Sequence, residues 1–151
     1  MKNWTKDRSL SLSICCVWIF AALLFAAFVW GYPLVRWYST AVEPIKADAR
    51  TAFLIALYGA GVFAWICLYC MLRLLRNMRA EKVFTDENVS LLRAVSWCCA
   101  GAAAVFLVCA VIYLPFIIPA VAAAFMMLIV RVVKNSFRQA CDMKEELDLT
   151  I

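Results

Sequence analysis

Cysteine is the residue type with the clearest capacity for chemistry in this sequence. Eight of the 151 residues are cysteines, and the pair Cys67-x-x-Cys70 has a spacing at which thiolates bind zinc or iron–sulfur clusters, with Cys98 and Cys99 as further candidate ligands. Both pairs fall inside apolar segments, where a neutral thiol packs as a small apolar side chain. We therefore expect structural cysteines and no cofactor, with a metal site at these four residues as the alternative.

Most other groups that catalyse reactions are missing from the sequence. It contains no histidine, which removes the commonest general base and metal ligand, and it has no Gly-rich phosphate loop or nucleophile elbow. The cores of its apolar segments carry no Asp, Glu, Lys or Arg, whereas proton and ion pathways usually need an ionisable residue there. We predict that the protein is not an enzyme, and a proton-coupled transporter is disfavoured.

Hydropathy determines the fold class. The chain is 67% apolar and 17% charged, far from the balance of a soluble protein. Four apolar segments, at about 10–32, 52–72, 94–114 and 116–132, approach or exceed the roughly 20 residues that cross a bilayer as a helix. The sequence therefore predicts an all-α integral membrane protein, a single domain over 1–151 that forms a four-helix transmembrane bundle.

The distribution of positive charge predicts the orientation. Twelve of the 15 Lys and Arg residues lie in the N-terminal segment, the link 73–93 and the tail from 131 onward, and three lie between the first two spans. Basic loops stay in the cytoplasm, so both termini, the link and the tail 133–151 are expected there, with helices extended beyond the membrane. Topology accounts for the net charge of +5, and we expect no direct contact with nucleic acid.

Small residues predict where helices pack closely. Ala52, Ala56, Ala60 and Ala64 recur at every fourth position of the second span with Gly59 beside them, and Gly101 offers a similar surface in the third span. Such ridges let helices approach closely in lipid. They are expected to pack the four helices together, with a homo-oligomer contact as the alternative.

The predicted cytoplasmic segments contain two further patterns. Thr85 precedes a predicted helix and is expected to cap it through its hydroxyl, while Arg73, Arg76 and Arg79 indicate that the second helix continues past the membrane. The acidic tail is either a solvated segment or an extended one, because Leu147, Leu149 and Ile151 alternate with polar residues as in a strand that pairs with a sheet edge.

Two motifs connect the chain to a family. Phe84-Thr85-x-x-Asn88-Val89 precedes the third span, and the chain ends in Glu145-Glu146-x-Asp148-Leu149-Thr150-Ile151. In these motifs and its four spans the sequence resembles a bacterial membrane family catalogued as domain of unknown function 2975, although its spans are richer in Cys and Ala. That family has no assigned activity, and its members are often encoded beside a small helix-turn-helix regulator of the Cro repressor type. The resemblance implies a bacterial inner-membrane location and a small cytoplasmic DNA-binding partner.

These observations lead to one expected function and one alternative. The expected function is a non-enzymatic membrane interaction or sensor protein that acts through its cytoplasmic face and tethers or controls the regulator. The alternative is an oligomeric channel, or a transporter of small solutes or membrane-active toxins. The expected partner-binding residues are Arg73, Arg76, Arg79, Phe84, Thr85, Asn88, Glu145, Glu146, Asp148, Leu149 and Ile151.

Overall fold

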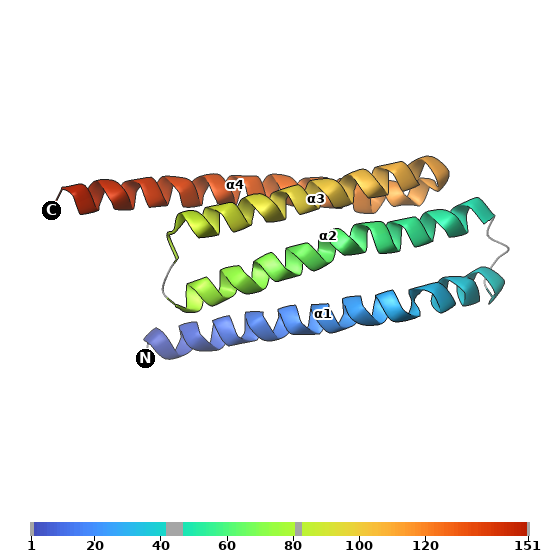
Figure 1. Cartoon of the computed structure of the whole chain (residues 1–151), viewed down its shortest axis with the longest axis horizontal. Helices are drawn as coiled ribbons and strands as arrows, with labels where there is room; N and C mark the ends of the chain where they lie inside the picture. The colour runs from blue at the N-terminus through green and yellow to red at the C-terminus, as the bar shows by residue number, and fades with distance from the viewer. Residues whose placement is uncertain (1, 42–46, 81–82, 151) are drawn as a thin grey trace.

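The chain folds into four long helices joined by short connections (Figure 1). The structure, a computed structural model, describes residues 2–41, 47–80 and 83–150, and only the backbone of residues 2–7, 39 and 47. The elements are α1 (Lys2–Ala41), α2 (Ala47–Arg79), α3 (Asp86–Ile112), the short 3₁₀ helix η1 (Leu114–Phe116) and α4 (Ile117–Leu149). All four α-helices are long and apolar enough to cross a membrane, so the expected all-helical, multi-pass membrane protein is confirmed.

Proline and backbone hydrogen bonds make the turn between α3 and α4 tight. Pro115 lies in η1, and the Tyr113 N–H donates to the Cys109 carbonyl at 2.9 Å, which closes the last turn of α3. The Phe116 N–H then donates to the Tyr113 carbonyl at 3.1 Å. Because proline lacks an N–H, it is tolerated where one helix has ended and the next has just begun. The two helices consequently run antiparallel as a hairpin.

Helix α1 continues beyond the expected end of the first span at about residue 32 and contains Pro33. Helix α1 continues through Pro33 to Ala41, and α2 begins at Ala47. A proline removes one backbone hydrogen bond, but a long apolar helix can keep the remaining ones on both sides. Most of the expected outer segment, residues 33–50, is therefore helical, and residues 42–46 lie outside the described residues.

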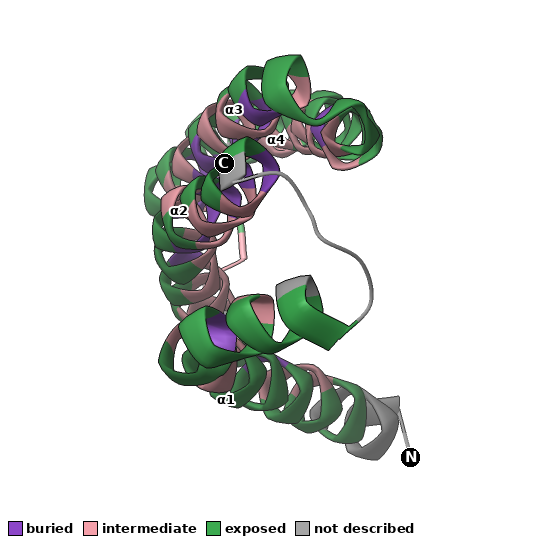
Figure 2. Cartoon of the chain, turned by 90° about the vertical axis from the view of Figure 1, so that its right-hand side faces the viewer, coloured by how far each residue is buried: buried purple, intermediate pink, exposed green. Residues whose placement is uncertain are grey.

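The four helices pack side by side as an open row. Helix α1 packs on α2, α2 on α3, and α3 on α4, and within the described residues α1 and α2 do not pack against α4. Seen along the helices, the row curves into a crescent with a concave face (Figure 2). In water an open row would leave too much apolar surface exposed, but lipid covers such surface without cost.

The tightest packing lies between α2 and α3. Ala52 and Ala56 form a buried cluster with Cys109 and are covered by Val105 and Phe106. Ala60 is also buried. A Cβ added to Gly59 would lie 3.2 Å from Val105, and one added to Gly101 would lie 2.5 Å from the Phe63 ring. The small residues of both helices thus make room for large side chains of the partner helix within one chain.

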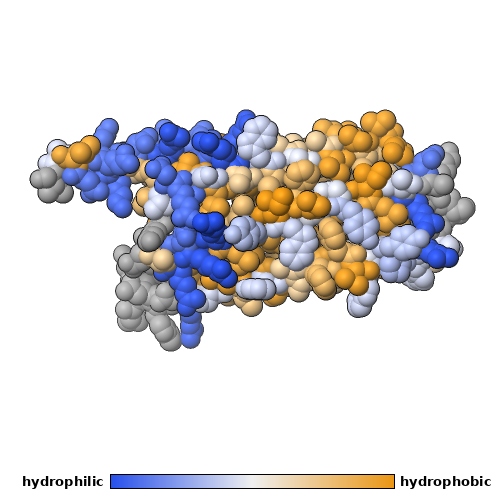
Figure 3. Space-filling model, viewed as in Figure 1, coloured by the Kyte–Doolittle hydropathy of each residue, from blue (hydrophilic) through white to orange (hydrophobic). Residues whose placement is uncertain are grey.

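The outer surface of the helices is apolar between two polar ends (Figure 3). Most of the apolar stretch of α1 is exposed, including Phe20 and Trp30, and Val111 of α3 is 89% exposed. Surface of this kind needs an apolar solvent, which agrees with four helices that span a membrane.

Candidate functional site

One end of the molecule, which we call the link end, contains the start of α1, residues 76–80 and 83–90, and residues 138–150 (Figure 1). The polar candidate site lies at this end. The opposite end holds the last turn of α1, the start of α2, and η1. Because four helices make an even number of crossings, the first turn of α1 and the last turn of α4 lie on the same side.

Thr85 occupies the expected position before α3 but does not cap the helix with its side chain. Its backbone is extended, with φ −137° and ψ 148°, and its carbonyl accepts from the N–H groups of Asn88 at 3.0 Å and Val89 at 3.3 Å. The side chain makes no capping hydrogen bond, which corrects the sequence-based expectation. Within the described residues its Oγ1 is buried and has no hydrogen-bond partner.

Asn88 joins three segments from inside the protein. It is fully buried, its Oδ1 accepts from Asn77 Nδ2 at 2.9 Å, and its Nδ2 donates to the Val83 carbonyl at 2.7 Å. A residue with no exposed surface cannot touch a partner, so Asn88 belongs to the fold and not to the expected contact surface. The sequence analysis did not identify Asn77; the available signal was an uncharged polar residue among the leucines, arginines and methionines at the end of α2.

A salt bridge adds a second connection between α2 and α3. Arg73 Nη2 lies 2.8 Å from Glu87 Oε1, and both side chains are about half exposed, at 53% and 48%. Exposed pairs of this kind contribute little to stability. The salt bridge nevertheless pairs Arg73 with a residue of its own chain. Arg76 and Arg79 are exposed to solvent on α2.

A polar cavity separates the start of α3 from the end of α4. Phe84, a residue of its wall, packs against Phe137 of α4 with ring centroids 5.9 Å apart. The cavity has a volume of about 320 Å³ and is lined by Phe84, Thr85, Asp86, Cys141, Lys144, Glu145 and Asp148. We call it the link-end cavity.

The thiol in the wall of this cavity is electrostatically disfavoured from ionising. Burial raises the pKa of Cys141, the carboxylates of Asp86, Asp142 and Glu145 raise it further, and Lys144 acts in the opposite direction. A thiol with a raised pKa is neutral at pH 7 and a poor nucleophile. The cavity therefore has the properties of a binding site and lacks an activated nucleophile.

Several expected contact residues from distant parts of the sequence meet at the link-end cavity. Phe84 and Thr85 of the link and Glu145 and Asp148 of the tail line the same space. Glu146 and Leu149 are exposed on α4 outside it, and Ile151 lies outside the described residues. Three further lining residues, Asp86, Cys141 and Lys144, were not expected from the sequence. For the two on α4 a signal was available, because positions 141, 144, 145 and 148 recur at the spacing of one helix face.

The tail is helical, which corrects the alternative of an extended segment. Helix α4 continues to Leu149, and the Thr150 hydroxyl donates to the Glu146 carbonyl in its last turn. In a helix the alternation of Leu147 and Leu149 does not define one face, because successive side chains are about 100° apart. Strand pairing by this segment is thus not available to the helical chain.

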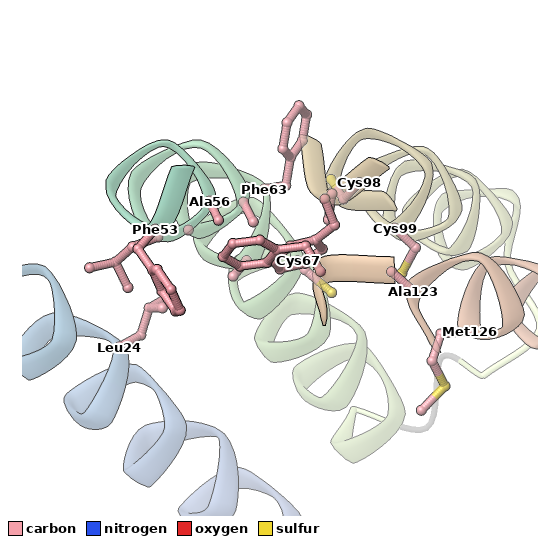
Figure 4. Close-up of a pocket in the computed structure, with 16 residues that line it drawn as sticks. Leu24, Phe53, Ala56, Phe63, Cys67, Cys98, Cys99, Ala123 and Met126 are labelled. Carbon is pink, nitrogen blue, oxygen red and sulfur yellow. The ribbon is translucent and has the colours of Figure 1, made fainter. Parts of the chain in front are cut away.

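A second, apolar candidate site lies on the concave face of the row (Figure 4). This groove has a volume of about 520 Å³ and is lined by residues of all four α-helices and η1, among them Leu24, Phe53, Phe63, Ala123 and Met126. It offers no ionisable oxygen or nitrogen, so its chemistry is limited to apolar contact.

Three of the four paired cysteines border the groove. Cys67, Cys98 and Cys99 line it (Figure 4). Cys70 is buried about one turn further along α2. All eight cysteines are free thiols, and within the described residues no three Cys, Asp or Glu side chains are placed to hold a metal ion. The arrangement brings the two pairs to adjacent helices without forming a metal centre.

Fold and site together define a class of protein: a four-helix, multi-pass membrane protein with a polar cavity at one end. The family profile of a protein of unknown function, DUF2975, matches residues 34–151, which include α2, α3 and α4 completely. The chain belongs to this family, which confirms the resemblance seen in its motifs. Comparisons with curated proteins and with solved structures found no match.

Proposed function

We propose that the protein is a non-enzymatic interaction protein of the bacterial inner membrane that presents the link end to a soluble cytoplasmic partner. The projection of α4 is the main observation in support. Helix α4 has 33 residues and α3 has 27, so in their antiparallel hairpin α4 extends beyond the start of α3 (Figure 1). Six extra residues correspond to about 9 Å of helix. All described residues from Asp142 onward are exposed.

The proposed orientation places the link end in the cytoplasm. Arg73, Arg76, Arg79 and Arg93 lie near this end on α2 and α3, and α4 adds Arg131, Lys134 and Arg138. The opposite end has far fewer basic residues. Positive charge beside membrane helices is retained on the cytoplasmic side. The partner would then be a cytoplasmic protein.

The chemistry of the projecting helix favours a basic partner. Asp142, Glu145, Glu146 and Asp148 outnumber the single Lys144, so this surface repels anionic lipid headgroups and nucleic acid phosphates. A small helix-turn-helix regulator, the partner that the family implies, has a basic surface with which it binds DNA. We propose that the membrane protein tethers or controls such a regulator through protein–protein contact.

The proposal is tested by partner capture from detergent extracts. Deletion of residues 147–151 and the charge reversal Glu146→Lys, on the exposed surface of the projecting helix, should each reduce capture of the basic partner while membrane insertion is unchanged. Arg36→Gln, which removes one charge at the opposite end, is the control and should capture normally. If both link-end variants capture as wild type does, the interaction proposal fails.

Transport is the second candidate, because the row of helices is open. The groove of about 520 Å³ faces the lipid-exposed concave side, and copies of the chain could close it into a pore or a path for an apolar solute. In that case Ala123→Trp, which fills the groove, should abolish transport or toxin resistance. Ala122→Trp, on the exposed side of the same helix turn, should have no effect.

A further inference from the structure

The link-end cavity carries an excess of unpaired negative charge. Asp86 from α3 and Glu145 and Asp148 from α4 line it, and Lys144 is the single cation among the lining residues. Within the part of the chain that the structure describes, none of these three carboxylates takes part in a salt bridge. The positive end of the α3 helix dipole offsets charge at Asp86 more than at the two α4 residues, because its effect is confined to the first turn.

A residue in the wall of the cavity also carries a buried hydroxyl without a hydrogen-bond partner in the described chain. Thr85 Oγ1 is buried and has no partner within the described residues, although a hydroxyl can accept two hydrogen bonds. A buried polar atom left unpaired costs free energy, which a ligand with N–H donors would recover. Phe84, 45% exposed, adds an aromatic ring to the same wall, and such rings attract cations.

We infer that the link-end cavity receives a cationic side chain, an arginine in preference to a lysine, from a basic segment of the partner protein. This inference rests on the proposed function and specifies the chemistry of its partner. The planar guanidinium has five N–H donors, so it can pair with Glu145 or Asp148, donate to Thr85 and stack on Phe84 at the same time. An ammonium group has three donors and no face for stacking, and therefore satisfies fewer of these groups.

Two other ligand classes fit less well. A metal ion is disfavoured because no three acidic or thiol side chains of the described chain are placed to ligate it. A phosphate would meet the helix start and Lys144, but the three carboxylates would repel it. A cationic side chain is attracted by the three carboxylates, and Lys144 is the single lining residue that opposes it.

The test is direct binding of a labelled hexa-arginine peptide to the full chain in neutral detergent at physiological ionic strength, with hexa-lysine and hexa-glutamate for comparison. Hexa-arginine should bind more tightly than hexa-lysine, and hexa-glutamate should not bind. Glu145→Gln with Asp148→Asn should weaken hexa-arginine binding by about tenfold or more, since hydrogen bonds to charged groups are lost. Thr85→Val, which keeps the shape of the side chain, should also weaken it.

The matched control separates the cavity from general attraction to an acidic helix. Asp142→Asn with Glu146→Gln also removes two charges, from residues of α4 that do not line the cavity, and should leave the affinity within about twofold. Equal loss in this control and in the Glu145 and Asp148 variant would overturn the inference. Conversion of a dimer to a monomer by that variant would also overturn it, because the occupant would then be a second copy of the chain.

The two proposals fail in different ways. If the link-end deletion abolishes partner capture but Glu145→Gln with Asp148→Asn does not, the interaction function stands and the arginine site is wrong. If hexa-arginine binds the cavity as expected but no link-end variant affects partner capture, the cavity binds cations and the proposed partner is wrong.

Discussion

Asn88 joins α2, the link and α3 through a single amide group. Asn88 is fully buried and its bonds to Asn77 and to the Val83 carbonyl are partly buried, so truncation leaves two partly buried polar groups unpaired. Asn88→Ala should therefore lower the free energy of unfolding by about 1–3 kcal/mol. Thermal unfolding in detergent measures the change, and Asn135→Ala, at an exposed position of α4, is the control. A loss smaller than that of the control would contradict the structural role of Asn88.

Cys141 provides a test of the electrostatics of the link-end cavity. Because burial and the neighbouring carboxylates raise its pKa, a variant that keeps only this cysteine should reach half of its maximal alkylation rate at a higher pH than a free thiol. Glu145→Gln removes one of the charges that raise the pKa, so the midpoint should move down. Glu146, which does not contribute to the shift, provides the control as Glu146→Gln, and its midpoint should not move.

For single residues, the sequence identified the two segments that meet at the link-end cavity but not the role of each residue within them. The motif around Phe84 and the acidic end of the chain were both selected, and four of their residues do share a cavity. The missing capping bond of Thr85 and the burial of Asn88 depend on where Asn77 and α4 lie. No local spacing encodes those tertiary neighbours, so these roles required the structure.

The contact between α2 and α3 is the element-scale feature that substitution can test most directly. Ala52 has no exposed surface and lies in the cluster with Cys109, so a larger side chain has no space there. Ala52→Leu should lower stability by about 1–3 kcal/mol through overpacking. Ala56 borders the groove, so substitution by a larger residue there is a less strict test of the packing. Ala122→Leu, on the exposed side of α4, should leave the melting temperature in detergent unchanged, and equal melting of both variants would show that the contact is loose.

Hydropathy predicted the existence and order of the helices, because a membrane segment must satisfy its own backbone and be apolar. Helices extended beyond the membrane were expected, but the residues at which they end were not. Helix α1 extends past Pro33 to Ala41, and α4 includes the tail to Leu149. Beyond the membrane, polar residues can be solvated in a helix or in a coil, so their polarity does not determine either conformation.

At the scale of the whole molecule, the sequence could not show whether the row of helices closes. Small residues identify faces that approach another helix, yet Ala52 and Gly101 do not specify which helix or which copy. In lipid the energetic difference between an open row and a closed bundle comes from packing alone, because burial of apolar surface gives no net gain. The crescent and its groove are therefore findings of the structure.

Orientation in the membrane is the whole-molecule prediction with the sharpest outcome. The helices have between 27 and 40 residues, so each exceeds the roughly 20 residues that span a bilayer and projects beyond it. In a variant without its native cysteines, a single cysteine at Ala41, Ala80 or Glu146 is exposed to reagent at one end or the other. A membrane-impermeant maleimide applied to intact cells, with the outer membrane opened, should label position 41 and spare positions 80 and 146. All three should react once the inner membrane is permeabilised, and reaction at position 80 beforehand would reverse the proposed topology and move the link-end cavity away from the cytoplasm.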